Sequence, residues 1–126
     1  MSLDDPEHLK EIFSAFGPVS VRRMFGGVGV YAEGTMFALV AYGDLYLKAD
    51  EETIPAFRAA GVGPFVYEAK GKRVVMSYWR LPDRLLDEPD ELAEWARAAL
   101  RVAQRSASAR PTRSRVATRK RNGRRR

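Results

Sequence analysis

The sequence has no cysteine among its 126 residues and a single histidine, and these absences exclude several kinds of chemistry. Without cysteine there are no disulfides, thiolate metal ligands or cysteine nucleophiles, which agrees with a reducing cytoplasm as the expected location. His8 follows Glu7 at the start of a predicted helix, where we expect a solvated side chain rather than a catalytic base. The acidic N-terminal residues lack the features of a signal peptide, and no apolar run is long enough to span a bilayer.

The best candidate group of carboxylates for a metal site lies where the last predicted helix starts. Acids in a first helical turn complement the helix dipole, so we interpret this group as helix stabilisation, with divalent-metal binding as the alternative. No serine or threonine has a base at a suitable spacing. We therefore expect no enzymatic activity, no metal and no cofactor. The carboxylate group consists of Asp87, Asp90, Glu91 and Glu94.

Apolar periodicity and turn residues predict one α+β domain over residues 1–103. A helix starts at Asp5-Pro6 and carries an apolar stripe until Gly17-Pro18 ends it; the stripe is Leu9, Ile12, Phe13 and Phe16. A second helix covers residues 50–60 with Thr53 as its cap, and a third begins after Asp87-Glu88-Pro89. The predicted fold is a two-layer α/β sandwich, with an antiparallel sheet of about five to six strands and three helices in the order α-β4-α-β2-α. The predicted strands are 19–24, 28–32, 36–41, 45–49, 65–70 and 74–80. Strand 36–41 is apolar on both faces, so we expect helices or a second chain to cover each side.

Charge divides the chain after residue 103. Residues 1–103 carry all 16 acids and 12 of the 22 lysines and arginines, whereas residues 104–126 carry 10 basic residues and no acid. Few large apolar side chains occur in residues 104–126, so we predict a disordered basic tail. Uncompensated cations attract phosphate chains, which predicts nonspecific nucleic-acid binding; a merely solvated tail and an anionic membrane surface are the alternatives. The predicted contact residues are Arg105, Arg110, Arg113, Arg115, Arg119, Lys120, Arg121, Arg124, Arg125 and Arg126.

The stretch "RRMFGGVGVYA", residues 22–32, contains three glycines and raises the question of a nucleotide site. Gly27 to Ala32 fits the dinucleotide pattern G-x-G-x-x-G/A, and Asp50 stands about 20 residues further on. That pattern needs a helix at its second glycine, whereas these residues favour strands and turns, so we interpret them as hairpin glycines.

Aromatic residues interleaved with basic ones suggest a second kind of nucleic-acid site. Such residues on a sheet can stack bases, but aromatic side chains on strands more often serve ordinary packing, which is the interpretation we prefer. The residues concerned are Tyr67, Tyr78 and Trp79 with Lys70, Lys72, Arg73 and Arg80.

Two segments, "VRRMFGGVGVYAEGTMFALVAYGDLYLKADEET" from Val21 and "MSYWRLPD" from Met76, resemble the N-terminal domain of the TfoX/Sxy proteins, bacterial regulators of competence for DNA uptake. The resemblance covers most of residues 10–103. It implies helices packed on an antiparallel sheet, and a role as co-activator alongside the cyclic-AMP receptor protein without known catalysis. Full-length regulators continue into a C-terminal helical domain where this chain has the basic tail. The family hallmark, of unassigned role, is Arg22, Arg23, Met24, Phe25, Gly26 and Gly27.

The residues and the resemblance together predict a non-enzymatic, cytoplasmic regulatory protein. Its folded domain is expected to bind a protein of the transcription machinery, while the basic tail adds nonspecific attraction to nucleic acid; no membrane partner is expected. The alternative is a small-ligand-binding or enzymatic domain that uses Arg22 and Arg23. A homodimer, formed through an edge strand or through the strand that carries Leu39, stays open.

Overall fold

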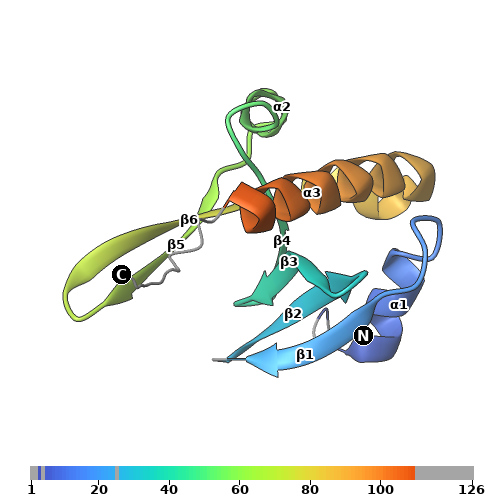
Figure 1. Ribbon diagram of the computed structural model, residues 1–126, viewed down its shortest axis with the longest axis horizontal. Coiled ribbons are helices and arrows are strands. Elements are labelled where there is room, and N and C mark those ends of the chain that lie inside the picture. Colours follow the sequence, from blue (N-terminus) through green and yellow to red (C-terminus); the bar gives the residue numbers. More distant parts are fainter. Residues whose placement is uncertain (1–2, 4, 25, 110–126) are drawn as a thin grey trace.

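The computed structural model describes residues 3, 5–24 and 26–109, and its elements follow the predicted α-β4-α-β2-α order (Figure 1). Each strand lies within two residues of its predicted bounds, whereas a short 3-10 helix, η1, was not predicted. The elements are α1 (Pro6–Ile12), β1 (Ser20–Met24), β2 (Gly27–Ala32), β3 (Thr35–Ala41), β4 (Asp44–Lys48), α2 (Ile54–Ala59), β5 (Pro64–Ala69), β6 (Lys72–Arg80), η1 (Asp83–Asp87) and α3 (Pro89–Ala109).

The six strands form one antiparallel sheet in the order β1-β2-β3-β4-β6-β5. The first four strands are a meander, and β6 then pairs with β4, which leaves β5 at one edge and β1 at the other. Three hairpin turns place a non-glycine residue and then a glycine at positive φ, the backbone conformation that tight two-residue hairpins require. These turns are Glu33-Gly34, Tyr42-Gly43 and Lys70-Gly71.

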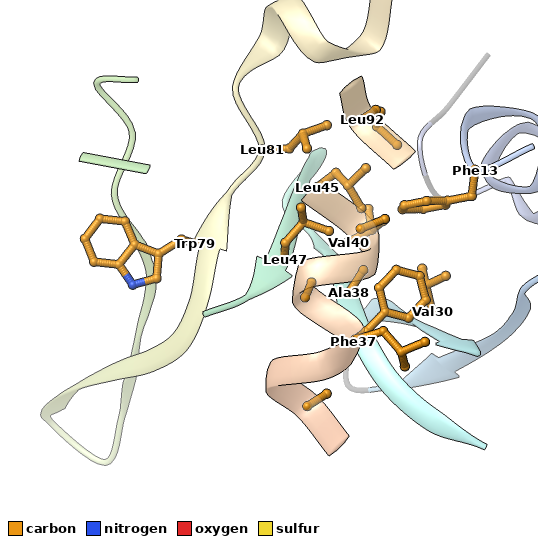
Figure 2. Packing of buried hydrophobic residues seen from close by; sticks show 14 of the residues in the cluster. Phe13, Val30, Phe37, Ala38, Val40, Leu45, Leu47, Trp79, Leu81 and Leu92 are labelled. Atoms are coloured by element: carbon orange, nitrogen blue, oxygen red, sulfur yellow. The ribbon is translucent and has the colours of Figure 1, made fainter. Parts of the chain in front are cut away.

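All three helices pack on the same face of the sheet, so the predicted two-layer α+β fold is confirmed. The helix-side core joins Phe13, which directly follows α1, and Leu92 of α3 to side chains of the central strands (Figure 2). Phe57 of α2 belongs to the same core, and α3 contacts β3 and β4. Trp79 of β6 lies apart from the centre of this core, where its ring meets that of Phe57 at a centroid distance of 6.1 Å. Burial of these large side chains provides most of the free energy that holds the two layers together.

A β-bulge in β3 alters which face several of its residues occupy. The register passes from Val30↔Ala38 to Tyr31↔Met36, so Phe37 is an extra residue on β3. Phe37 and Ala38 therefore both face the helices, although neighbouring residues of a regular strand point to opposite faces. As a consequence Met36 and Leu39 both face the side of the sheet away from the helices.

One expectation is narrowed and another needs correction. Helices cover only one side of β3, because the described helices all belong to the helix-side core; cover of the other side by a second chain stays a prediction. The last helix continues to Ala109, so residues 104–109 are helical rather than disordered, while residues 110–126 of the basic tail lie outside the described residues. None of the helices in the described ranges has the length and apolar character needed to cross a membrane.

Candidate functional site: an apolar groove on the open face of the sheet

The face of the sheet away from the helices carries a second apolar cluster. Its floor is formed by strand residues that are nearly buried without any described helix above them. They surround a hollow of about 540 Å³, which we call the open-face groove and which falls within the usual size range of ligand sites. The groove is lined by Met24, Gly27, Met36, Leu39, Ala41, Tyr42, Phe65, Tyr67 and Met76.

Two glycines of β2 shape this side of the sheet, and each acts through its missing side chain. A Cβ on Gly27 would collide with the backbone carbonyl oxygen of Val40, so only glycine lets β2 approach β3 there. A Cβ on Gly29 would stand 2.7 Å from the sulfur of Met36 and 3.3 Å from the terminal methyl of Met24. Gly29 therefore leaves the space that the two methionine side chains occupy.

Tyr42 stands at the rim of the groove and is unusually exposed for an aromatic residue. Its side chain is 83% exposed, and its φ of 51° places a bulky residue in a backbone region that glycine and asparagine prefer. Its ring lies 6.0 Å from that of Phe65, which in turn contacts Tyr46 at 5.1 Å and Tyr67 at 5.8 Å. A row of aromatic rings thus leads from the nearly buried Tyr46 and Phe65 to Tyr42 at the rim, which is the most exposed of them.

Cationic side chains share the groove side of the sheet outside its lining. Arg22 shares a face with Met24 by strand alternation, and its guanidinium lies 5.2 Å from the centre of the Tyr31 ring. Lys72, at the start of β6, shares a face with Met76. Arg80, at the other end of β6, pairs with Asp44 at 3.2 Å and with Asp83 at 3.1 Å.

The hallmark residues occupy the end of β1, the turn and the start of β2, and they divide between two faces. Arg22 and Met24 lie on the groove side, while Arg23 points to the other side, so the two arginines do not converge on one ligand. Gly26 has a φ of +78° in the turn, and Phe25 lies outside the described residues. The structure therefore places Met24 and Gly27 in the groove lining and uses Gly26 for the turn.

Among known protein families, the TfoX N-terminal domain matches residues 11–103 of this chain, which include the whole sheet. The chain belongs to the TfoX N-terminal domain family. The resemblance noted in the sequence is thereby confirmed, and the groove is a feature of a TfoX N-terminal domain.

Two curated relatives are similar to this chain. One is Protein Sxy of Escherichia coli, 27% identical over 107 residues, which covers 85% of this chain and 51% of the relative. The other is DNA transformation protein TfoX1 of Aliivibrio fischeri, 31% identical over 97 residues, or 74% of this chain and 46% of the relative. The chain thus spans about half the length of the relatives that it matches.

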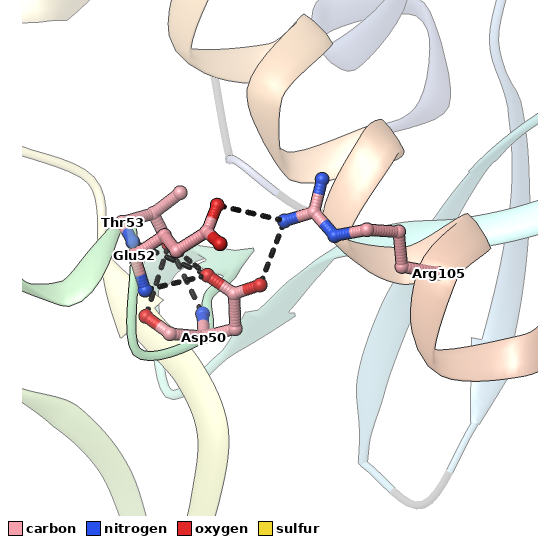
Figure 3. Close-up of polar contacts among 4 residues, drawn as sticks. All are labelled: Asp50, Glu52, Thr53 and Arg105. Atoms are coloured by element: carbon pink, nitrogen blue, oxygen red, sulfur yellow. Dashed lines mark hydrogen bonds and ion pairs between the residues drawn. The ribbon is translucent and has the colours of Figure 1, made fainter. Parts of the chain in front are cut away.

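In this TfoX N-terminal domain, Arg105, one of the predicted nucleic-acid contacts, also pairs with acids of the loop before α2. It lies on α3 and its Nη2 donates to Asp50 Oδ2 at 2.7 Å, with Glu52 Oε1 3.9 Å away (Figure 3). The hydrogen bond from Arg105, helped by backbone donors, holds the pKa of Asp50 below its ordinary value. The charge of Arg105 is therefore compensated by acids from outside residues 104–126, and its contact with nucleic acid stays a prediction.

Asp50 also caps the segment that leads into α2. Its Oδ1 accepts from the backbone N–H groups of Glu52 and Thr53, at 3.0 and 3.2 Å, while Thr53 Oγ1 accepts from the N–H of Asp50 at 3.0 Å. The sequence identified Thr53 as the residue before the helix, but the capping bonds to this turn come from Asp50. Because Gly27–Ala32 is a strand and Asp50 is a cap, the dinucleotide interpretation does not fit the structure.

The other candidate sites do not assemble. Within the described ranges, no group of three or more acidic or histidine side chains could hold a metal ion, and Glu91 instead accepts two hydrogen bonds of 2.8 Å from Arg84, which lower its pKa. Tyr67 and Tyr78 lie on the groove side, whereas Trp79 belongs to the helix-side core, so the three rings do not form one stacking platform. His8 is partly buried, with its Nδ1 3.7 Å from Glu11.

Sequence reasoning missed the groove as a site, although it noted one of its signals. The strand 36–41 was seen to be apolar on both faces, but no pattern revealed that the second face stays uncovered by helices. Three of the four methionines line this face, a concentration typical of adaptable binding surfaces. Such a concentration becomes visible only after the strands have been placed in order.

Proposed function

We propose that this protein is a non-enzymatic regulatory protein that acts in the cytoplasm. Its folded domain docks a protein of the transcription machinery through the open-face groove, and residues 110–126 add nonspecific attraction to nucleic acid. The observation that carries the proposal is the groove itself, an apolar hollow across a sheet face that no described helix covers. Apolar surface of this kind, rich in methionine and aromatic residues, is characteristic of protein-binding sites.

The groove chemistry favours binding over catalysis. Catalysis by side chains needs a nucleophile or an acid–base pair beside the bound substrate, and the lining consists of apolar side chains, glycine and tyrosine. The family relationship supports a regulatory role, since one relative is named as a DNA transformation protein. That name describes a protein of which the match covers only 46%. A regulatory role for this chain is therefore part of the proposal.

The nucleic-acid half of the proposal rests on charge. Residues 110–126 contain nine lysines and arginines and no acid. Each phosphate that such a cation neutralises releases a counterion, so affinity for duplex DNA should fall with salt at a slope of about −0.9 per contact. This attraction follows charge and carries no sequence preference.

A pair of neighbouring substitutions on β6 tests the docking half. Met76 lines the groove, whereas Val75 is 59% exposed and points to the other side of the same strand. Met76→Glu should remove the protein partner recovered by affinity capture after nuclease treatment, and Val75→Glu should retain it. Retention of the same partner by both variants would overturn docking through the groove. Tyr42→Ala provides a second groove variant, because its exposed side chain contributes little to folding.

Replacement of the cations in residues 110–126 by glutamine, in the full chain, tests the other half. Fluorescence anisotropy with duplex DNA over a range of salt should show weaker binding and a shallower salt slope. If the wild type and the glutamine variant have equal affinity and equal salt slope, residues 110–126 do not contribute to nucleic-acid binding. The alternative of a small-ligand or enzymatic domain predicts instead that a nucleotide or metabolite raises the melting temperature in a thermal-shift panel.

A further inference from the structure

The charges around the open-face groove indicate which kind of partner segment it binds. Two exposed cations lie on the groove side of the sheet, outside the lining: Arg22 two residues before Met24 on β1, and Lys72 four residues before Met76 on β6. Among the described residues neither forms an ion pair, whereas Asp44 and Asp83 share the single cation Arg80. The groove is therefore apolar, with an unpaired cation beyond it on β1 and another on β6, and complementary charge favours an acidic partner that reaches both.

Resting on the docking function proposed above, we propose that the open-face groove binds an acidic, extended segment of a partner protein, whose apolar side chains enter the groove while carboxylates meet Arg22 and Lys72. An extended segment presents alternate side chains to one face, so one row of apolar residues can fill the hollow. The methionines Met24, Met36 and Met76 suit such an occupant, because unbranched thioether side chains adapt to different apolar shapes.

Nucleic acid fits this groove less well than an acidic peptide. A base inserted there would bury polar edges against a lining that offers few hydrogen-bonding groups, and unpaired buried polar groups are costly. The rings of Tyr46, Phe65 and Tyr78 are at least nine-tenths buried and present little flat surface for base stacking. Tyr42 at the rim is largely exposed, but one exposed ring does not form a platform on which successive bases stack.

Two other occupants conflict with the same charges. A second copy of the domain facing the groove would bring the cations of two identical faces together, and like charges oppose association. The chain's own residues 110–126 offer Val116 as the one large apolar side chain among nine cations, which matches neither the apolar groove nor the cations beyond it.

The experiment follows the methionine methyl signals of the full chain, labelled with carbon-13, by NMR during titration with three probes. The first is a peptide in which leucine and phenylalanine alternate with aspartate and glutamate. The second keeps its apolar residues and replaces the acids with lysine, and the third is an oligothymidine of similar length. We expect the acidic peptide to shift the signals of Met24, Met36 and Met76 and to bind about tenfold more tightly than the basic one, or about 1.4 kcal/mol. The oligothymidine should leave these three signals unchanged.

Two charge-swapped double variants with the same net charge separate the groove from residues 110–126. Arg22→Glu with Lys72→Glu changes the groove side, and Arg23→Glu with Arg73→Glu changes the neighbouring positions on the other side of the same strands. The first pair should weaken the acidic peptide about tenfold and the second less than about threefold. Equal weakening by both pairs would overturn the proposal, because the attraction would then be general.

The outcomes also distinguish this proposal from the function on which it rests. Tighter binding of the basic peptide, or methyl shifts caused by oligothymidine, would refute the acidic occupant while leaving docking through the groove intact. Failure of all three probes to move the methyl signals, with partner capture still lost in Met76→Glu, would likewise refute only the occupant. If Met76→Glu and Tyr42→Ala both retain the partner, the docking function itself fails.

Discussion

Gly27→Ala is the substitution that most directly tests how β2 and β3 approach each other. Alanine normally gains about 0.4–1 kcal/mol over glycine by restricting the unfolded chain, provided that the folded backbone accepts it. Here the new methyl group would meet the carbonyl oxygen of Val40, which is backbone and cannot rotate away. Forced overpacking of this kind typically costs about 1–3 kcal/mol. The net loss in unfolding free energy should therefore be about 1–2 kcal/mol.

Urea unfolding monitored by tryptophan fluorescence measures this change. Both tryptophans, Trp79 and Trp95, contact Phe57 in the helix-side core, with ring centroids 6.1 and 5.0 Å away, so their emission reports on the packed domain. In thermal unfolding the same loss should lower the melting temperature by about 5–15 °C for a domain of this size.

Gly63→Ala is the matched control, because no atom lies within 4 Å of its added methyl group and its φ is not positive. It should leave the unfolding free energy unchanged or raise it by up to about 1 kcal/mol. A Gly27→Ala protein as stable as the wild type, or an equal loss in Gly63→Ala, would refute the close approach of the two strands.

Three further predictions concern charge, pH and the groove rim. Arg105→Gln should leave the salt slope of DNA binding nearly unchanged because Asp50 already pairs with this arginine, whereas Arg119→Gln should reduce it by about 0.9; anisotropy compares the two. Asp50→Asn keeps a capping oxygen but loses the ion pair with Arg105, and should cost up to about 1 kcal/mol at neutral pH. Because folding lowers the pKa of Asp50, this stabilisation is present above its unfolded value of about 3.9 and is lost as the pH falls through the folded value. Urea unfolding near pH 7 and near pH 3 should thus show a difference that shrinks in acid; a constant difference would contradict the assignment. Tyr42→Asn should change the unfolding free energy by less than about 1 kcal/mol, since relief of positive-φ strain offsets the lost Phe65 contact, yet weaken the acidic peptide about tenfold.

The strands and helices were predictable because their signals are local. The stripe of Leu9 and Phe13 and the cap at Asp5 identified α1, and the X-Gly pairs marked the hairpin turns. The first helix nevertheless ends at Ile12, earlier than the apolar stripe suggested, and α3 continues past the change in composition at residue 103. Local composition could not predict that Arg105 pairs with Asp50, which lies in the loop before α2 and far away in the sequence.

The candidate site was predicted only in part. The hallmark from Arg22 to Gly27 was recognised without a role, and the structure gives separate tasks to Met24, Gly26 and Gly27. Met36 and Leu39 lie three positions apart, and strict alternation would have put them on opposite faces. The bulge at Phe37 brings them together, and a bulge depends on how β2 and β3 pair.

The sequence by itself determined the element order, the class of fold and the separation of acidic and basic regions, because apolar periodicity, turn residues and charge act over a few neighbouring positions. Only the tertiary structure decided the order of strands in the sheet, the single face that the helices cover and the groove that the other face holds. Those features depend on how residues far apart in the chain come together, such as Met24 and Met76, which line the same groove, and no local pattern encodes them.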